Sequence, residues 1–296
     1  MKRKKNSTNY DINSNIKERK KTKKRYKLKW RNLIILLIIT GLIITLIISL
    51  CKIISWKLES FKSKKEINEI NDIVEVIEVT SNENTEIIEN DVPKSDPYWD
   101  YIKMNMINVD FKELKKENSD TKGWIKVNGT NINYPFVQTT NNEFYLKHSF
   151  NKNYNSGGWI FMDYRNNLEN LEKNTIIYGH SRLDTTMFGS LKNILNNGWL
   201  DNKNNYIIKL SDEYQNTLWQ VFSVYHLPAT SDYLRVKFFS DADFYEFSNK
   251  LLNRSVYNFN TTVDENDKIL TLSTCYKNDE RLALHAKLIK IEKKSQ

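Results

Sequence analysis

Cysteine, histidine and glycine are scarce in this sequence of 296 residues, which contains two cysteines, four histidines and eight glycines. The cysteines and histidines do not form the short-spaced clusters that bind a structural zinc ion, so no metal site is expected. The glycines do not form a phosphate-binding loop, which argues against a nucleotide enzyme. We therefore expect neither a metal nor another cofactor.

Most of the chain carries no excess of positive charge, although the net charge of the whole chain is +9. Residues 1–32 contain fourteen Lys and Arg against only Asp11 and Glu18, so this tail contributes +12 and the remainder carries about −3. Proteins that bind nucleic acid usually present a basic face on their folded part. No nucleic-acid partner is therefore expected.

One long hydrophobic run, Leu33 to Cys51, has 19 uncharged residues. At about 1.5 Å per residue, a helix of this length spans most of a hydrocarbon core of ~30 Å. A cleaved signal peptide is the alternative, but residues 52–56 offer no small-residue cleavage site. Because basic residues favour the cytoplasmic side, we predict a single-pass helix in membrane lipid, with a cytoplasmic N-terminus and an extracellular domain.

Four segments follow from these patterns: a basic cytoplasmic tail (1–32), a transmembrane helix (33–54), an extracellular linker (55–97) and a folded domain (98–296). The linker is rich in Lys, Glu and Asn with isolated Ile and Val. The spacing of its isoleucines is compatible with a helical stripe, but the residues after position 74 lack the density of a packed helix.

The folded domain is predicted to be mostly β. Residues 98–118 are predicted to be helical, and residues 123–138 alternate polar and apolar around Asn128-Gly129, a hairpin signal. Further strands are expected at 159–164, 174–180, 205–210, 218–227, 268–275 and 281–291, and helices at 185–195 and 240–255. Ser240 and Asp243 fit a helix capping box. Many short strands with few helices are typical of a barrel or sandwich.

Cys275 is predicted to be a free extracellular thiol. Cys51 lies at the membrane boundary, more than 200 residues away in the sequence, so an internal disulfide is not expected. The thiol is then either a buried spectator or a reactive group. A thiol nucleophile needs a nearby base or acid, and a donor for the charge that develops on the attacked carbonyl.

The four histidines are the candidates for that base or acid. His180 ends a predicted strand and precedes a polar loop, which makes it the first choice. His285 shares the alternating face of its strand and is expected along the strand rather than at its end. His226 precedes Leu227-Pro228 and is compatible with a loop histidine, whereas His148 lies in a stretch rich in Asn and Lys. On spacing alone, any one of these histidines is more often structural than catalytic.

Arg281 begins the strand that follows the loop at residues 276–280. A hairpin with this loop places Cys275 and Arg281 side by side, where the guanidinium can serve as the donor. The alternative is a strand-end arginine paired in solvent with Asp279 or Glu280. The spacing does not separate these two possibilities.

Several motifs resemble the sortases. They are TLSTC (271–275) followed by Arg281 and HAKL (285–288), and NTIIYGHSRLDTTMFGSL (174–191). The details resemble class B, through INYPFVQ (132–138), NNEFYLKHSF (141–150), GGWIFMDYRN (157–166) and SDADFYEFSNKLLNRS (240–255). The resemblance runs from about Trp99 to Ile291. The loop at residues 276–280 is shorter than in the class B pattern.

The resemblance implies a membrane-tethered cysteine transpeptidase built on a closed eight-stranded β-barrel with peripheral helices, so residues 98–296 would be the catalytic domain. Such enzymes cleave a C-terminal sorting motif of a secreted protein after Thr through a thioacyl-enzyme. They then join that Thr to an amine of a peptidoglycan precursor. By resemblance, Cys275 is the nucleophile, His180 the general acid/base and Arg281 the oxyanion or substrate-positioning residue.

The resemblance also implies substrate-binding positions. These are Ser273, Asn142, Leu146, Tyr233 and Leu234. Two alternatives remain: an envelope cysteine protease that releases its product to water, and a non-catalytic, membrane-anchored wall-binding module with an inert buried thiol.

Overall fold

The computed structural model describes residues 29–88, 97–276 and 279–294. The strands are β1 (Val76–Val79), β2 (Thr85–Ile87), β3 (Met106–Val109), β4 (Thr121–Val127), β5 (Asn133–Val137), β6 (Phe161–Met162), β7 (Asn174–Tyr178), β8 (Ile207–Asp212), β9 (Gln215–Pro228), β10 (Ile269–Cys275) and β11 (Glu280–Lys293). The α-helices are α1 (Trp30–Ile73), α2 (Tyr98–Tyr101), α3 (Lys112–Glu117), α4 (Asn197–Leu200) and α5 (Asp241–Asn253). Short 3₁₀ helices are η1 (Phe144–Leu146), η2 (Leu191–Leu195) and η3 (Lys203–Asn205).

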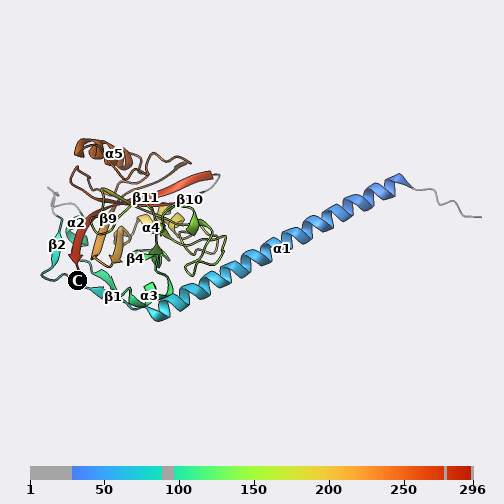
Figure 1. Cartoon of the computed structure of the whole chain (residues 1–296). Coiled ribbons are helices and arrows are strands. Elements are labelled where there is room, and N and C mark those ends of the chain that lie inside the picture. The colour runs from blue at the N-terminus through green and yellow to red at the C-terminus, as the bar shows by residue number, and fades with distance from the viewer. Residues whose placement is uncertain (1–28, 89–96, 277–278, 295–296) are drawn as a thin grey trace, which may run out of the picture. The chain divides into compact units, whose positions relative to one another are not determined.

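Eight strands of the described chain form a closed barrel (Figure 1). Their order is β10-β7-β6-β5-β4-β8-β9-β11, and antiparallel pairing of β10 with β11 closes the ring. Most neighbours are antiparallel, whereas β7 runs parallel to β10 and β5 runs parallel to β6. Short strand β2 extends the sheet beside the far end of β11. The predicted mostly β barrel with peripheral helices is therefore confirmed.

Helix α1 contains a stretch that is long and apolar enough to cross a membrane, and no residue of that stretch is buried. The chain divides into two compact units, residues 1–53 and 54–296. The early part of α1 therefore fits the predicted anchor by length and composition. Its orientation in a membrane stays a prediction.

The segment predicted as a linker, residues 55–97, contains more regular structure than its sequence indicated. It holds the second part of α1 together with β1 and β2. β1 pairs antiparallel with β3, and β2 with β11, so both strands join the barrel unit. The predicted domain boundary at residue 98 stays a prediction.

The predicted hairpin at Asn128-Gly129 is confirmed, because β4 and β5 pair antiparallel on either side of it. Gly129 has φ +70°, a conformation that side chains disfavour. A Cβ there would also meet the side chain of Asn205 at 2.4 Å. Glycine is therefore needed at this turn on two grounds.

Two helix predictions were wrong in part. Within residues 98–118, the middle forms strand β3, because Met106, Ile107 and Val109 are buried in the core. Burial in tertiary structure overrides local helix propensity here. Within residues 185–195, only the last five residues are helical, in η2, and the preceding turn has positive φ at Thr185 and Met187.

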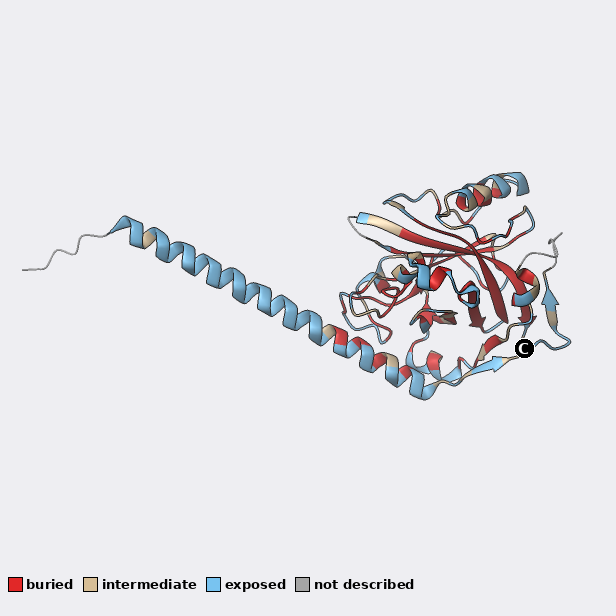
Figure 2. Ribbon diagram, turned by 180° about the vertical axis from the view of Figure 1, so that it is seen from behind, coloured by how far each residue is buried: buried red, intermediate tan, exposed pale blue. Residues whose placement is uncertain are grey.

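Helix α5 is confirmed, with the Ser240 side chain accepting a hydrogen bond from the Asp243 backbone N–H at 3.2 Å. Its apolar residues Phe244, Phe247 and Leu251 pack against β9 and against Tyr233 in a cluster separate from the barrel core. Figure 2 shows buried residues on one side of α5 and along the barrel strands. This packing fixes the long connection between β9 and β10.

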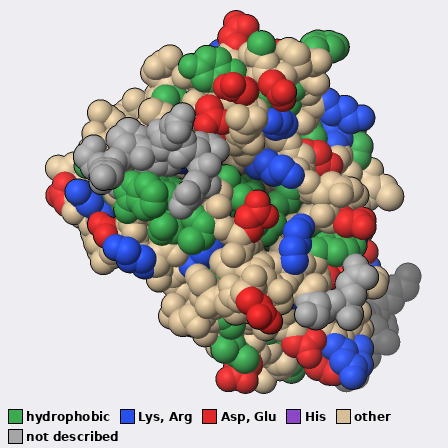
Figure 3. All heavy atoms as spheres, turned by 90° about the vertical axis from the view of Figure 1, so that its left-hand side faces the viewer, with side chains coloured by type: hydrophobic (Ala, Val, Ile, Leu, Met, Phe, Trp, Pro, Cys, Tyr) green, Lys and Arg blue, Asp and Glu red, His purple; other side chains and the backbone are tan. Residues whose placement is uncertain are grey.

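Figure 3 shows Lys, Arg, Asp and Glu side chains of both signs scattered over one face, with groups of hydrophobic side chains between them. This mixture agrees with the small net charge of the chain beyond residue 32. Long-range attraction of a highly charged polymer requires charges of one sign gathered together. The face in view does not have that arrangement.

Candidate active site

A pocket of about 270 Å³ opens at one end of the barrel. All eight residues predicted to be catalytic or substrate-binding line this pocket: Asn142, Leu146, His180, Tyr233, Leu234, Ser273, Cys275 and Arg281. Five further residues line it as well: Phe161, Tyr178, Gly179, Thr230 and Thr274. The structure thus brings together the three candidate catalytic residues and the five candidate substrate-binding residues. Their roles are treated below as proposals.

Parallel pairing of β7 with β10 places Cys275 and His180 at the same end of the barrel. In the register of these strands, Tyr178 lies opposite Ser273. Cys275 and His180 each follow two residues later, beyond the point where both strands leave the buried wall. Residues 269–274 of β10 are buried, whereas Cys275 is exposed. The thiol therefore faces solvent at the mouth of the pocket.

Arg281 lies directly opposite Cys275 in the antiparallel pair of β10 and β11, as the hairpin pattern predicted. Within the described residues, its guanidinium makes one long contact, from Nη1 to the Glu280 carbonyl oxygen at 3.4 Å. The Glu280 carboxylate instead lies 2.9 Å from Nδ1 of His226. In this structure Arg281 is therefore not the solvent-paired arginine of the alternative interpretation.

The ring of His180 is held by one strong hydrogen bond. Its Nε2 lies 2.8 Å from the carbonyl oxygen of Leu146, in η1. A carbonyl oxygen can only accept, so Nε2 donates this hydrogen bond, and Nδ1 has no hydrogen-bond partner among the described residues. The backbone carbonyl of His180 accepts from Arg182 N at 3.1 Å and from Phe188 N at 3.0 Å. Both the side chain and the backbone of His180 are thereby positioned.

The other three histidines lie outside the pocket. His285 is buried between the Tyr225 hydroxyl at 2.8 Å and the Thr271 hydroxyl at 2.9 Å. Burial, helped by the positive charge of Arg254, lowers the pKa of His285 to about 3, so its ring is neutral. His148 stacks on Phe144 with ring centroids 4.0 Å apart. These contacts identify structural histidines, and the expectation that His285 lies along its strand is confirmed.

The substrate-binding candidates are held by specific contacts. Tyr233 is fully buried and its hydroxyl lies 2.8 Å from that of Ser273. The Asn142 amide donates to Asp163 at 3.0 Å and accepts from the Tyr164 backbone N–H at 3.0 Å. Hydrogen bonds therefore hold the pocket wall at Tyr233, Ser273 and Asn142.

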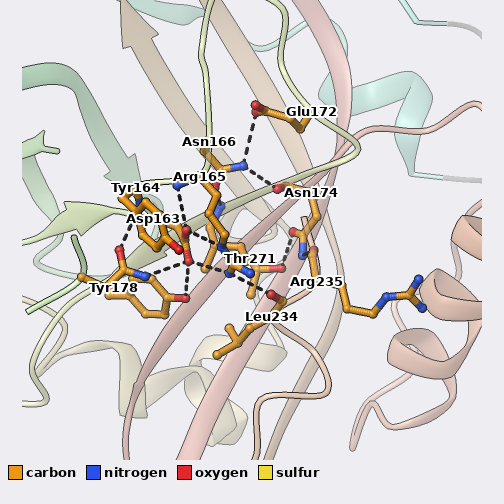
Figure 4. A network of polar contacts seen from close by, with 12 residues as sticks. Asp163, Tyr164, Arg165, Asn166, Glu172, Asn174, Tyr178, Leu234, Arg235 and Thr271 are labelled. Atoms are coloured by element: carbon orange, nitrogen blue, oxygen red, sulfur yellow. Dashed lines mark hydrogen bonds and ion pairs between the residues drawn. The ribbon is translucent and has the colours of Figure 1, made fainter. Parts of the chain in front are cut away.

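A polar network beside the pocket was not found from the sequence (Figure 4). Buried Asp163 accepts two hydrogen bonds from the Arg165 guanidinium and one from the Tyr178 hydroxyl, each 2.8 Å long. Burial alone would raise the pKa of Asp163, but these donors and Asn142 hold it below its ordinary value. Arg165 also donates to the Leu234 carbonyl at 3.0 Å, which ties this network to the opposite wall.

Gly179 and Thr230 also line the pocket but were not singled out in the sequence. A Cβ on Gly179 would lie 2.8 Å from the Phe188 ring, so the backbone before His180 approaches its neighbour closely. The glycine that precedes His180 was the available signal. Over the described ranges, no group of three or more His, Cys, Asp or Glu is placed to hold a metal ion. Independence from metal stays a prediction.

The Sortase domain family model matches residues 125–289, which is more than half of the chain and includes every pocket residue. The chain belongs to the sortase family. Sortase B of Staphylococcus aureus is 38% identical over 185 residues, covering 61% of this chain and 75% of the relative. Sortase B of Listeria monocytogenes is 35% identical over 170 residues, covering 56% and 67%. The similarity identifies class B, and enzymes of this sortase class are transpeptidases that anchor proteins to the cell wall.

Solved class B sortases share the fold. The Bacillus anthracis sortase B structure superposes with a TM-score of 0.62 at 31% identity, covering 79% of this chain and 99% of that one. A substrate complex of S. aureus sortase B gives 0.57 at 38% identity, covering 61% and 84%. A complex of sortase B with triglycine also gives 0.57 at 38% identity, covering 62% and 86%.

Proposed function

We propose that this sortase cleaves a C-terminal sorting motif of secreted proteins after Thr and joins the Thr to an amine of a peptidoglycan precursor. The observation that carries the proposal is the convergence of Cys275, His180 and Arg281 on one pocket. These residues come from the ends of β10 and β11 and from the loop after β7. A thiol, an imidazole and a guanidinium supply the nucleophile, the proton carrier and the oxyanion donor of acyl transfer.

In the first half-reaction, the Cys275 thiolate attacks the Thr carbonyl and the new oxyanion is bound by Arg281. Arg281 is suited to this role because its guanidinium has donors without partners among the described residues. Protonated His180 gives a proton to the departing amine, the C–N bond breaks, and a thioacyl-enzyme remains. In the second half-reaction, the acceptor amine attacks the thioester carbonyl and gives a proton to His180. The C–S bond then breaks, the new amide is released, and the Cys275 thiolate and protonated His180 are restored.

We further propose that the sorting peptide lies along Asn142, Leu146, Tyr233, Leu234 and Ser273. Support comes from their shared pocket, and from the substrate complex of a class B relative. The complex of a class B sortase with triglycine supports an amine acceptor here. The long apolar part of α1 supports an anchor in membrane lipid, with residues 1–32 cytoplasmic and the catalytic domain outside.

The test is to incubate the full chain in detergent micelles with a peptide library, then to locate acyl adducts by mass spectrometry. We expect an adduct on Cys275 that ends in Thr. Added triglycine should divert the product from hydrolysis to amide formation, and a chelator should leave the rate unchanged. Hydrolysis that triglycine does not divert would favour the envelope protease. Absence of any adduct, with Cys275 resistant to alkylation, would favour the wall-binding module, although the exposure of Cys275 argues against it.

A further inference from the structure

The second part of α1 presents one narrow polar face to the barrel unit. Ser60, Ser63, Glu66 and Ile70 are its buried residues, with exposures of 8%, 1%, 8% and 4%. Their spacing of three or four places them on one face of the helix. Three of the four are polar, so directed hydrogen bonds rather than apolar burial dominate this contact.

One set of these bonds reaches the loop that follows His180. The Ser60 hydroxyl donates to the Asp184 carboxylate. Asp184 also forms an ion pair with Arg182 at 3.2 Å, and both side chains are at least 94% buried. The Thr186 hydroxyl donates to the same carboxylate at 2.6 Å. Ser60 therefore completes the coordination of a buried ion pair two to four residues beyond His180.

The loop after His180 needs external support because its backbone is strained. Thr185 has φ +66° and Met187 has φ +51°, which is unfavourable for residues with side chains, above all a β-branched one. Such conformations persist only where the surroundings over-determine them. The ion pair of Arg182 and Asp184 lies within this same turn.

A second set of bonds reaches the segment on the other side of His180. The Asn155 amide donates to the Ser63 hydroxyl at 2.9 Å, and the Asn151 backbone N–H donates to Glu66 at 2.7 Å. Asn155 N in turn donates to the Lys147 carbonyl, next to Leu146, whose carbonyl accepts from the His180 ring. The helix thus contacts both chain segments that fix His180.

The two segments also touch each other beneath the helix. The Arg182 guanidinium occupies the space where a side chain on residue 157 would lie, because a Cβ on Gly157 would be 1.2 Å from Nη1. Asn155, two residues earlier, is the partner of Ser63. Ser60 and Ser63 therefore join the helix to one continuous unit that carries the His180 ring and backbone.

We propose that residues 59–70 of α1 are a clamp that positions His180, with Ser60 and Ser63 as its positioning residues. This proposal rests on the proposed function in that His180 must deliver a proton to the leaving amine. It makes the part of the helix just beyond the membrane-spanning stretch a component of the catalytic apparatus rather than a spacer. Loss of the clamp should slow proton delivery while the peptide pocket stays formed.

The experiment compares the double variant Ser60→Ala/Ser63→Ala with Ser55→Ala, a matched change at an exposed serine of the same helix. We expect kcat for peptide cleavage to fall roughly ten- to hundredfold in the double variant, since small displacements of a catalytic group cost rates of this order. KM should change little. Ser60→Thr keeps the hydroxyl group and should retain most of the kcat of the unmodified chain. Ser55→Ala should have the same kcat as the unmodified chain.

Hydrogen exchange separates the clamp from the proposed function. In the double variant we expect faster exchange across residues 147–157 and 181–189, with unchanged exchange in β8 and β9. Unchanged kcat together with unchanged exchange would overturn the clamp while leaving the proposed function intact. Faster exchange in a chain that never forms an acyl adduct with any peptide would support the clamp's contacts but overturn both its catalytic role and the proposed function.

Discussion

Strands β7, β10 and β11 carry two polar clusters, one buried on the side that the connection between β9 and β10 covers and one at the end of the barrel. In the buried cluster, Thr271 donates its hydroxyl hydrogen to Asn174 Oδ1 at 2.7 Å, so Nδ1 of the neutral His285 ring donates to Thr271 and Nε2 accepts from the Tyr225 hydroxyl. The Asn174 amide then donates to the Arg235 carbonyl at 2.8 Å. Hydrogen bonds link all five of these residues, so the cluster helps to specify how the strands fit together.

The cluster at the barrel end is built on the same strands but is incomplete. Cys275 is exposed, and Arg281 has one long contact within the described chain. Unsatisfied donors are costly in a core but are available to a ligand at a pocket. The difference teaches that position along a strand decides whether its polar residues stabilise the fold or remain free for chemistry.

The largest effect is expected for Cys275→Ala, which removes the proposed nucleophile. Adduct formation and peptide cleavage should fall below detection because no other thiol lines the pocket. The melting temperature should stay unchanged, since the side chain is exposed. Mass spectrometry and thermal melts measure the two outcomes. Cys51→Ala in the full chain is the matched control and should retain full activity.

Next in size is a matched pair of histidine variants, His180→Gln and His285→Gln. His180→Gln should lower kcat by roughly 10²- to 10⁴-fold, because general acid/base catalysis is lost. Its melting temperature should stay unchanged. The second should lower the free energy of unfolding by about 1–3 kcal/mol, because buried partners lose their hydrogen bonds. Enzyme assays and denaturant titrations check the pair. Similar loss of stability in both variants would contradict the division between the two clusters.

Arg281→Lys is expected to lower kcat by about 10²-fold, the order seen when one oxyanion donor is removed. Lysine keeps the charge but loses the planar arrangement of donors. Steady-state kinetics on a cleaved peptide gives the measurement, with circular dichroism to confirm the fold. Near-normal turnover would mean that Arg281 supplies only a positive charge.

The smallest expected effect is on the pH dependence of stability. The pKa of His285 is lowered from its ordinary value of 6.5 to about 3 in the folded chain. Between these two pH values the His285 ring is therefore protonated in the unfolded chain and neutral in the folded chain. His285 therefore makes the folded state less stable as pH falls from about 6.5 towards 3. Denaturant titrations should show the stability gap between the unmodified chain and His285→Gln narrowing by roughly 1–2 kcal/mol from about pH 6.5 to about pH 5.

Two buried carboxyl groups change stability with pH in the direction opposite to His285. Comparison with His285→Gln separates the contribution of His285, because both chains contain these carboxyl groups. Burial raises the pKa of Asp212 and of Asp267 to about 6. Each folded-state carboxyl therefore holds its proton at a pH where the unfolded carboxyl has lost it, and stability rises as pH falls through 6. A gap that stays constant with pH would contradict a neutral, buried His285.

The sequence predicted those parts of the site that depend on local geometry. A short loop between two strands places Cys275 beside Arg281 whatever the rest of the fold. His180 is different, because its approach to Cys275 depends on parallel pairing between β7 and β10, whose paired residues are 95 positions apart. Spacing carries no information about that pairing, and only the family resemblance connected the two residues.

The sequence missed the parts that are held by polar contacts. The second part of α1 attaches mainly through Ser60, Ser63 and Glu66, and Ile70 is the one apolar residue on its buried face, so the isoleucine spacing marked only the end of this contact. Asp163 and Tyr178 lie on different strand ends, and their pairing follows only from the barrel. Patterns of hydrophobicity detect apolar burial, but they do not detect a helix face or strand end that is attached by hydrogen bonds.

Closure of the barrel has a consequence for how the chain folds during synthesis. β11 follows every other strand of the ring in chain order, and it must pair with both β9 and β10. Partners in the β9–β11 pair lie 52 to 78 positions apart (280 − 228 and 293 − 215), and pairings over such sequence distances form slowly. A chain that emerges N-terminus first would therefore wait with the edges of β7 and β9 unpaired, open to other strands and to proteases. Cys275 and Arg281, the proposed nucleophile and oxyanion donor, both lie on this final hairpin, so the proposed active site can form only when the barrel closes.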